Sequence, residues 1–248
     1  MFNIFSKSKK SGTGIADFPS LKADMHSHLL PGIDDGAPDL ETSLRLIRGM
    51  NELGYTKLIT TPHVMGDMYR NTSAGIKEKL EIVKEALQQN NINVELNAAA
   101  EYFLDDYLEQ ILRNNEPLLP ISGNMVLVEF SLAYPSHSLK DILFTMQMQG
   151  YVPVIAHPER YIYLENSRNF YDELKDIGCH FQLNILSLTN HYGKSVHELA
   201  NYLIKKGYYN LVGTDLHHSR HLEALHSSVL VSPLKKLIDS GQLKNAEL

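Results

Sequence analysis

The chain has 248 residues, of which 43% are hydrophobic, and a formal net charge of −6 at pH 7. This length and apolar content are sufficient for one sizeable core. No run approaches the roughly 18 apolar residues of a membrane-spanning helix, and the single cysteine, Cys179, excludes an internal disulfide and suits a reducing cytoplasm. The negative charge argues against a nucleic-acid partner held by bulk electrostatics.

The first 20 residues combine Lys, Ser and Gly with little periodicity. They predict a flexible basic tail, 1–20, ahead of a single folded domain, 21–248. The tail has no apolar h-region, so a secretory signal is not predicted. Phe2, Ile4 and Phe5 stand beside lysines, which leaves contact with an anionic membrane surface as an alternative to a disordered leader.

From residue 21 onward, short apolar runs alternate with segments whose apolar residues recur every three or four positions. The runs predict strands at 21–25, 57–61, 93–100, 125–128, 152–156, 179–183 and 210–214. The periodic segments predict helices at 39–53, 73–89, 104–113, 138–149, 166–177, 194–206 and 221–239. Pro233 is expected to break the last helix or to lie in its first turn. This alternation of strands and helices predicts βαβ units and a parallel sheet.

A charged or imidazole side chain closes six of these strands: His28, His63, Glu101, Glu129, His157 and Asp215. An open doubly wound sheet fits the alternation equally well. Side chains from so many strand ends converge on one point only when the sheet closes, because the C-terminal mouth of a barrel is then the active face. We therefore predict a distorted (β/α)7 barrel that is similar to a TIM barrel.

The segment 24–36 brings two histidines and two carboxylates close together. His26 and His28 stand two apart at the end of a strand, and alternate residues of a strand point to one face. A Pro-Gly pair then breaks the strand, and Asp34 and Asp35 follow in a turn. Imidazole and carboxylate are ligands that zinc, manganese and iron accept, so the segment indicates a metal site.

Nine residues in all are candidate metal ligands, which exceeds the needs of one ion of four- to six-fold coordination. Such a set suits two or three ions that share bridging carboxylates. The nine are His26, His28, Asp35, His63, Glu101, Glu129, His157, Asp215 and His217. Asp24 and Asp34 remain alternatives to Asp35.

Two arginines, Arg160 and Arg220, follow shortly after candidate ligands. A guanidinium offers paired donors to a phosphate, so metals and arginines at one mouth indicate an anionic phosphoester, with a surface salt bridge as the alternative for each arginine. Tyrosines at 102, 134 and 161 are predicted to form an aromatic wall beside the site, with ordinary partly buried tyrosines as the alternative. A cysteine-dependent phosphatase mechanism is excluded, because it needs an arginine six residues after the cysteine and Ile185 stands there.

These segments resemble the PHP (polymerase and histidinol phosphatase) superfamily. The resemblance rests on DMHSHLLPGIDDG at 24–36, TTPH at 60–63, AAEY at 99–102, LVEFS at 127–131, IAHPERY at 155–161 and GTDLH at 213–217. Within the superfamily, the chain is similar over 22–225 to the manganese-dependent bacterial protein-tyrosine phosphatases of capsule and exopolysaccharide gene clusters.

The resemblance implies a ligand set and a substrate. One ion would be held by His26, His28, Glu101 and Asp215, a second by Glu101, Glu129 and His157, and a third by Asp35, His63 and His217. Arg160 and Arg220 would clamp the phosphate. The two to three divalent ions, manganese or otherwise iron or zinc, would supply a hydroxide for in-line attack on phosphorus. The protein would be a cytoplasmic phosphatase, and its substrate would be phosphotyrosine on the tail of a tyrosine kinase that regulates polysaccharide synthesis.

Three alternatives use the same scaffold. A small-molecule phosphoesterase such as a histidinol-phosphate phosphatase would employ the same ligands behind a different pocket rim. A non-catalytic binding module would be expected to show a degraded ligand set, which is not seen here. A nuclease role lacks support, because the chain has neither a basic stripe nor extra domains to hold nucleic acid.

Overall fold

The computed structural model describes residues 16, 18–134 and 138–248. Most of the predicted tail therefore lies outside the described residues, as does the predicted membrane contact of Phe2, Ile4 and Phe5. Ala16 and Phe18 are buried in the core, and the Phe18 ring packs 5.6 Å from that of Tyr55. The packed core therefore includes these apolar side chains, which precede the predicted domain start at residue 21.

The strands occupy the predicted positions and form two sheets. One sheet contains β1 (Ala23–Asp24), β2 (Lys57–Thr60) and β4 (Glu95–Ala98). The other contains β3 (His63–Val64), β5 (Glu101–Phe103), β6 (Met125–Glu129), β7 (Val152–Ile155), β8 (His180–Asn184) and β9 (Leu211–Gly213). The strand β3 continues the path of β2 after a break at Pro62, which has no N–H to donate. In the same way β5 continues β4, so these strands correspond to the seven predicted ones.

The curled sheet is parallel at every named strand pair. Its two ends are joined where Ser27, after β1, forms a parallel bridge with Leu216, after β9. At this seam the N–H of His28 donates to the carbonyl of Leu216 (2.9 Å), and the N–H of Asp215 donates to the carbonyl of His26 (2.7 Å). The predicted barrel-like α/β fold is therefore confirmed, and its seam runs through predicted ligands.

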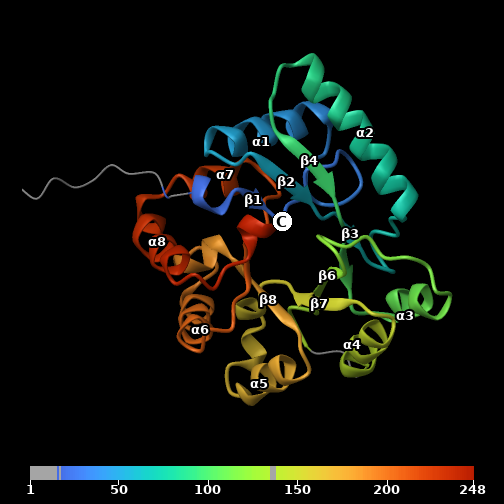
Figure 1. Cartoon of the computed structure of the whole chain (residues 1–248), viewed down its shortest axis with the longest axis vertical. Coiled ribbons are helices and arrows are strands. Elements are labelled where there is room, and N and C mark those ends of the chain that lie inside the picture. The colour runs from blue at the N-terminus through green and yellow to red at the C-terminus, as the bar shows by residue number, and fades with distance from the viewer. Residues whose placement is uncertain (1–15, 17, 135–137) are drawn as a thin grey trace, which may run out of the picture.

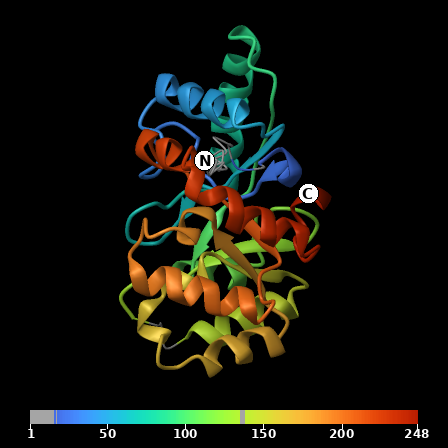
Figure 2. The ribbon, with the colours of Figure 1, turned by 90° about the vertical axis from the view of Figure 1, so that its left-hand side faces the viewer.

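Helices surround the strands, as Figure 1 shows in face view and Figure 2 from the side. They are α1 (Leu40–Glu52), α2 (Ser73–Gln89), α3 (Asp106–Arg113), α4 (Leu139–Met148), α5 (Asn169–Asp176) and α6 (Lys194–Lys205). The single helix predicted at 221–239 is instead two, α7 (Ser219–Leu225) and α8 (Val231–Asp239), with Pro233 in the first turn of α8. None of the helices in the described part of the chain has the length and apolar character needed to cross a bilayer.

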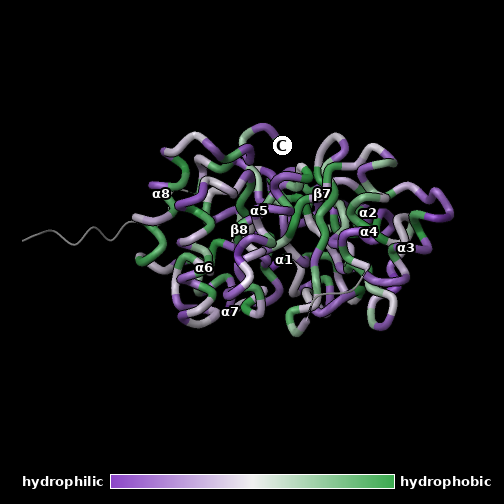
Figure 3. Tube along the Cα trace, turned by 90° about the horizontal axis from the view of Figure 1, so that it is seen from below, coloured by the Kyte–Doolittle hydropathy of each residue, from purple (hydrophilic) through white to green (hydrophobic). Residues whose placement is uncertain are grey.

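Two apolar clusters stabilise the barrel. The larger lies between the sheet and the helices, and the smaller fills the barrel interior with Met25, Ile59, Ala99, Ile121, Leu127, Val154, Ala156 and Leu211. The tube in Figure 3 shows mostly hydrophobic residues at strand β7. The interior cluster lies below the strand ends and supports the side chains that project from them.

The C-terminal residues close the other end of the barrel, and the C-terminus lies over the ring of strands in Figure 1. Leu248 packs against the interior cluster. The buried Asn245 side chain accepts from the N–H of Val212 (2.9 Å) and donates to the carbonyls of Val212 (2.8 Å) and Ala23 (3.1 Å). One amide thus links the first and last strands.

We predict that Asn245→Ala lowers the free energy of unfolding by about 1–3 kcal/mol, because buried backbone groups on two strands lose their partner. Urea denaturation of the metal-loaded protein measures the change. Glu247→Ala, an exposed position in the same segment, is the matched control. Equal stability of the two variants would contradict the linking role of Asn245.

Candidate metal centre

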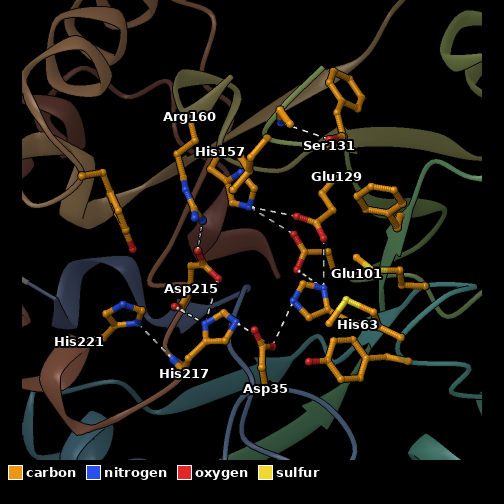
Figure 4. A pocket seen from close by; sticks show the side chains of 18 of the residues that line it. Asp35, His63, Glu101, Glu129, Ser131, His157, Arg160, Asp215, His217 and His221 are labelled. Atoms are coloured by element: carbon orange, nitrogen blue, oxygen red, sulfur yellow. Dashed lines mark hydrogen bonds and ion pairs between the residues drawn. The ribbon is translucent and has the colours of Figure 1, made fainter. Parts of the chain in front are cut away.

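The nine predicted ligands converge at the C-terminal ends of the strands. Seven of them line a cavity of about 560 Å³: Asp35, His63, Glu101, Glu129, His157, Asp215 and His217. Figure 4 shows these side chains pointing toward one another. His26 and His28 are fully buried and come within 3.3 Å of Glu101. Residues from seven parts of the chain therefore meet at one mouth.

The possible ligand atoms fall into four overlapping groups, within each of which they lie within 4.8 Å of one another. The groups are His28, Asp35, His63 and His217; His26, His28 and Glu101; His26, His157 and Asp215; and His63, Glu101 and Glu129. Each predicted ligand belongs to at least one group. Several groups share members, which is the arrangement expected of ions with bridging carboxylates.

Glu101 is the hub of the cluster. Its Oε2 lies 3.1 Å from His26 Nε2 and 3.3 Å from both His28 Nε2 and His63 Nδ1. Its Oε1 lies 3.4 Å from His157 Nε2, in a geometry that makes no hydrogen bond. One fully buried carboxylate therefore faces four imidazoles.

Hydrogen bonds on the far side of three histidines fix which nitrogen carries the proton. Nδ1 of His26 donates to Gln182 Oε1 (2.9 Å), and Nδ1 of His28 donates to Asp34 Oδ2 (2.8 Å). Nδ1 of His217 donates to the backbone carbonyl of Asp215 (2.9 Å). Because each of these partners accepts a hydrogen bond from Nδ1, the Nε2 lone pair of each neutral ring points into the cluster, as in metal-ligating histidines.

The donor set fits divalent ions. Nε2 of His26 and Nε2 of His28 lie 3.4 Å apart, so two lone pairs converge on the same space. Oε1 of Glu101 and Nδ1 of His63 are buried without a hydrogen-bond partner among the described residues. Buried polar atoms are rarely left in this state unless a further group satisfies them. The residues present therefore match the needs of ions bound between them.

Mutual charge interactions shift the pKa values of the cluster. Burial alone would lower the pKa of His26, but the carboxylates of Glu101 and Asp215 raise it to about 9. The same balance applies to His63 and His217. Burial disfavours their charged forms, but neighbouring carboxylates favour them more strongly, so their pKa values rise to about 10 and about 9. The histidines in turn outweigh burial at Glu101 and hold its pKa well below the usual range. The metal-free cluster is thus a buried ion-pair network.

The backbone is left-handed at two candidate ligands. His157 has φ +32° and Asp215 has φ +51°. Such conformations cost free energy in non-glycine residues and persist where surrounding contacts impose them, often at functional sites. Both residues lie two positions after a strand, and the turn of the chain there directs their side chains to the cluster.

Asp215 is held from behind by two donors. Nδ2 of Asn184 donates to its Oδ2 at 3.0 Å, and Nη1 of Arg160 donates to the same oxygen at 2.8 Å. The guanidinium of Arg160 also lies over the ring of Tyr192, 4.7 Å from its centroid. These contacts leave Oδ1 of Asp215 facing the histidines, 3.3 Å from His26 Nε2.

The structure separates the three competing aspartates. Oδ1 of Asp35 lies 3.4 Å from Nε2 of His63 and 3.4 Å from Nε2 of His217. Asp34 instead orients His28, and Asp24 accepts from the backbone N–H of Thr214. Among the three, only Asp35 belongs to a group of converging ligand atoms.

Other predicted residues lie elsewhere. Arg160 lines the cavity, whereas Arg220 is exposed on α7 and is not among the residues that line it. The predicted tyrosine wall was wrong, because Tyr102 and Tyr161 are buried. The hydroxyl of Tyr102 accepts from the N–H of Leu119 and that of Tyr161 donates to the carbonyl of Ala156. Tyr134 is exposed and lines a neighbouring cavity.

The sequence analysis missed three supporting residues. Gln182 and Asn184 stand two apart in β8, so that both point inward, and this pair of amides in an apolar strand was the available signal. Glu159 is buried and accepts from the N–H of Asn184 (2.9 Å) and the hydroxyl of Tyr209 (2.8 Å). Glu159 therefore fixes Asn184, which in turn fixes Asp215.

A family model described as "Capsular polysaccharide synthesis, CpsB/CapC" matches residues 22–229. The chain belongs to the CpsB/CapC family. The match spans β1 through α7, and so covers every residue of the candidate metal centre. Membership of the CpsB/CapC family agrees with the resemblance of the chain to phosphatases of capsule gene clusters.

Several CpsB/CapC relatives have names that describe an activity. The chain is 27% identical to the tyrosine-protein phosphatase YwqE of Bacillus subtilis, over 79% of this chain and 77% of that protein. It is 30% identical to the tyrosine-protein phosphatase CpsB of Streptococcus pneumoniae, over 79% of this chain and 82% of that protein.

Solved structures agree on the fold. A chain from the crystal structures of YwqE and CpsB, described as unique metal-dependent tyrosine phosphatases, superposes with a TM-score of 0.74 at 24% identity, covering 88% of this chain and 94% of that one. The lactonase Lmo2620 of Listeria monocytogenes superposes with a TM-score of 0.54 at 11% identity, covering 92% and 91%. These likenesses concern the fold alone.

We predict that metal-free protein loses stability as the pH rises. The raised pKa values of His26, His63 and His217 mean that their charged forms stabilise the fold fully below the unfolded-state value of about 6.5. That contribution is lost as the pH rises through about 9 to 10. Urea denaturation of chelator-treated protein from pH 6 to 10 measures the loss, and His63→Gln should make the fall shallower. A flat profile would contradict the ion-pair network.

We predict that Asn184→Ala weakens metal binding by about tenfold to a hundredfold, because one of the two donors that orient Asp215 is removed. Calorimetric titration of chelator-stripped protein with Mn²⁺ measures the affinity. The exposed Asn190, replaced by alanine, is the matched control. Unchanged affinity in Asn184→Ala would show that Arg160 alone orients Asp215.

Proposed function

We propose that this chain is a metal-dependent protein-tyrosine phosphatase. The observation that carries the proposal is the set of four overlapping ligand groups at a cavity that Arg160 also lines. Further support comes from relatives named tyrosine-protein phosphatases in two bacterial genera. A metal cluster beside a guanidinium is suited to a phosphate ester, which carries negative charge on its non-bridging oxygens.

The proposed cofactor is two to three divalent ions. One would be held by His26, His28, Glu101 and Asp215, a second by Glu101, Glu129 and His157, and a third by Asp35, His63 and His217. The mixed nitrogen and oxygen donors suit manganese, with iron and zinc compatible. Bound ions in such a site supply an activated water and positive charge against the phosphoryl oxygens.

Arg160 is the proposed phosphate clamp of the protein itself. One of its guanidinium nitrogens is occupied by Asp215, and Tyr192 lies against its face. These two contacts hold the group at the edge of the cavity, and its other donors have no hydrogen-bond partner among the described residues. These remaining donors would bind the phosphate. Because Arg220 does not line the cavity, the proposed clamp rests on Arg160.

A phenolate is a suitable leaving group for this site. Tyrosine has a pKa of about 10, so that it departs with less proton assistance than an alkyl alcohol needs. His218 and His221 also line the cavity. This chemistry favours phosphotyrosine over esters of aliphatic alcohols.

The proposed substrate is a phosphotyrosine segment on the tail of a bacterial tyrosine kinase that regulates polysaccharide synthesis, and the proposed location of this chain is the cytoplasm. The family's link with capsular polysaccharide synthesis and the names of its tyrosine phosphatases support this setting. The lone Cys179, which is buried and unpaired, is compatible with a reducing compartment.

We predict that chelator-stripped protein releases no phosphate from a phosphotyrosine peptide and that added Mn²⁺ restores release. His63→Ala and Asp215→Ala should each lower kcat/KM at least a hundredfold while the metal-loaded variants retain the fold, because both side chains lie at the barrel mouth rather than in its apolar core. Phosphate release is followed with a colorimetric assay, and histidinol phosphate is tested in parallel. Turnover of histidinol phosphate alone would favour a small-molecule phosphatase.

A cysteine variant provides the control for mechanism. Burial raises the pKa of the Cys179 thiol to about 12, so that the thiol is not ionised near neutral pH. Cys179→Ala should therefore retain turnover. Full activity of His63→Ala, or loss of activity only in Cys179→Ala, would refute metal-dependent hydrolysis.

A further inference from the structure

The cavity above the candidate ligands has an apolar wall on one side. Segments that follow β3, β5 and β6 supply it, and they contribute Met65, Met68, Tyr69, Phe103, Phe130 and Leu132. The rim on the β8 and β9 side is instead formed by Tyr192, His218 and His221. The candidate metal ligands form the polar floor of this cavity. A polar floor and one apolar wall suit a molecule with an anionic end and a hydrophobic body.

The strand geometry places part of this wall directly above the metal ligands. Phe103 follows Glu101 by two residues in β5, so both side chains face one side of that strand. Met65 lies two residues after His63, just beyond the end of β3. His63 and Glu101 are also partners in register across β3 and β5. Two residues of a strand rise roughly 6.6 Å. A layer of apolar side chains therefore lies about one ring length above the floor.

This layer distinguishes two kinds of phosphate ester. When the phosphate lies at the floor, a phenyl ester places its ring between the apolar side chains. A phosphoserine would place its short methylene and polar backbone there, and burial of backbone groups without partners is unfavourable. The wall therefore favours an aryl ester.

The loop that carries Met68 is fixed in position. The N–H of Met65 donates to the carbonyl of Tyr69 (2.9 Å), and the N–H of Tyr69 donates back to the carbonyl of Met65 (3.0 Å). The N–H of Gly66 donates to Oδ2 of Asp105 at the start of α3 (2.8 Å). A Cβ at position 66 would lie 2.8 Å from Cβ of Tyr107, so the hairpin packs against α3 as only glycine permits.

Met68 lies at the tip of this hairpin with 67% of its surface exposed. Its side chain contributes little to the core, yet it lines the cavity of the candidate metal centre. Leu132, 45% exposed, lines the same cavity from the segment after β6. A flexible thioether adapts to the face or edge of an aromatic ring, so that an exposed methionine at this place is suited to contact the substrate.

A second cavity of about 820 Å³ adjoins the first and shares Met65, Met68, Phe103 and Phe130 with it. It lies toward α3 and contains none of the candidate metal ligands. The shared wall therefore has space on both of its sides. The substrate peptide on one side of the phosphotyrosine would continue into this second cavity.

We propose that the hairpin 65–69, through Met68 and together with Phe103, contacts the phenyl ring of the substrate and selects aryl over alkyl phosphates. This inference rests on the proposed function, and it names residues that determine the substrate specificity of the proposed phosphatase. Met68 is a specificity-determining residue and takes no part in the chemical step.

Binding of two inert phosphonates tests the proposal without turnover. Phenylphosphonate and methylphosphonate are titrated calorimetrically into Mn²⁺-loaded protein. The unaltered protein should prefer phenylphosphonate, and Met68→Ser should weaken its binding roughly fivefold to tenfold while leaving methylphosphonate unchanged. In turnover of a phosphotyrosine peptide, the same variant should raise KM and leave kcat nearly unchanged.

Two variants serve as controls. Met148→Ser alters a methionine of similar exposure, 71%, on α4 and outside both cavities, and should change neither affinity. Met68→Leu keeps an apolar side chain and should retain most of the preference for phenylphosphonate. Equal weakening of both phosphonates by Met68→Ser, or no weakening of either, would overturn the proposal.

The two proposals fail in different ways. Absence of phosphotyrosine turnover in the unaltered, Mn²⁺-loaded protein would refute the proposed function, whatever the phosphonates show. Normal turnover combined with an unchanged affinity ratio in Met68→Ser would refute only the role of the hairpin.

Discussion

The burial of Glu101 among four imidazoles is the constraint on which the site depends. A carboxylate without access to water is unfavourable unless cations or donors surround it, and here His26, His28, His63 and His157 do so from three strand ends. His26 and His28 come from the same segment, whereas His63 and His157 each come from a different part of the barrel. The closed sheet is therefore what makes the cluster possible, since an open sheet would separate the first strand from the last. The seam between Ser27 and Leu216 brings the outermost ligands together.

The period of two along each strand organises the barrel into layers. Below the strand ends lies the apolar interior cluster with Leu127 and Val154. At the strand ends lie the ligands and, behind them, the amides of Gln182 and Asn184 that orient them. Above the ligands lies the apolar wall. Stability, metal binding and substrate contact are thus separated along the barrel axis, so that changes in one layer need not disturb the next.

The sequence predicted the strands, most helices and the candidate ligands, because a charged residue directly after an apolar run is a local signal. Gln182 and Asn184 offered only the spacing of two amides in an apolar strand, and Glu159 offered no local signal, since its role depends on partners at least 25 positions away. The tyrosine wall failed for a reason the sequence contained, because Tyr102 follows Glu101 directly and must face the other side of its strand. The early start of the packed domain at Ala16 was hidden, because a few apolar residues in a polar stretch do not reveal the contact with Tyr55.

The asymmetry of the cavity explains how one metal centre could serve different phosphate esters. The floor recognises only the phosphate, whose charge and shape are the same in every monoester. Discrimination must therefore come from the loops beyond the strands, as in other barrels whose active face lies at the C-terminal mouth. Here the loops after β3 and β6 supply Met68 and Leu132, whereas the segments beyond β8 and β9 supply Tyr192 and His218. Because these loops lie outside the layer of candidate ligands, the proposed specificity contacts are separate from the proposed metal centre.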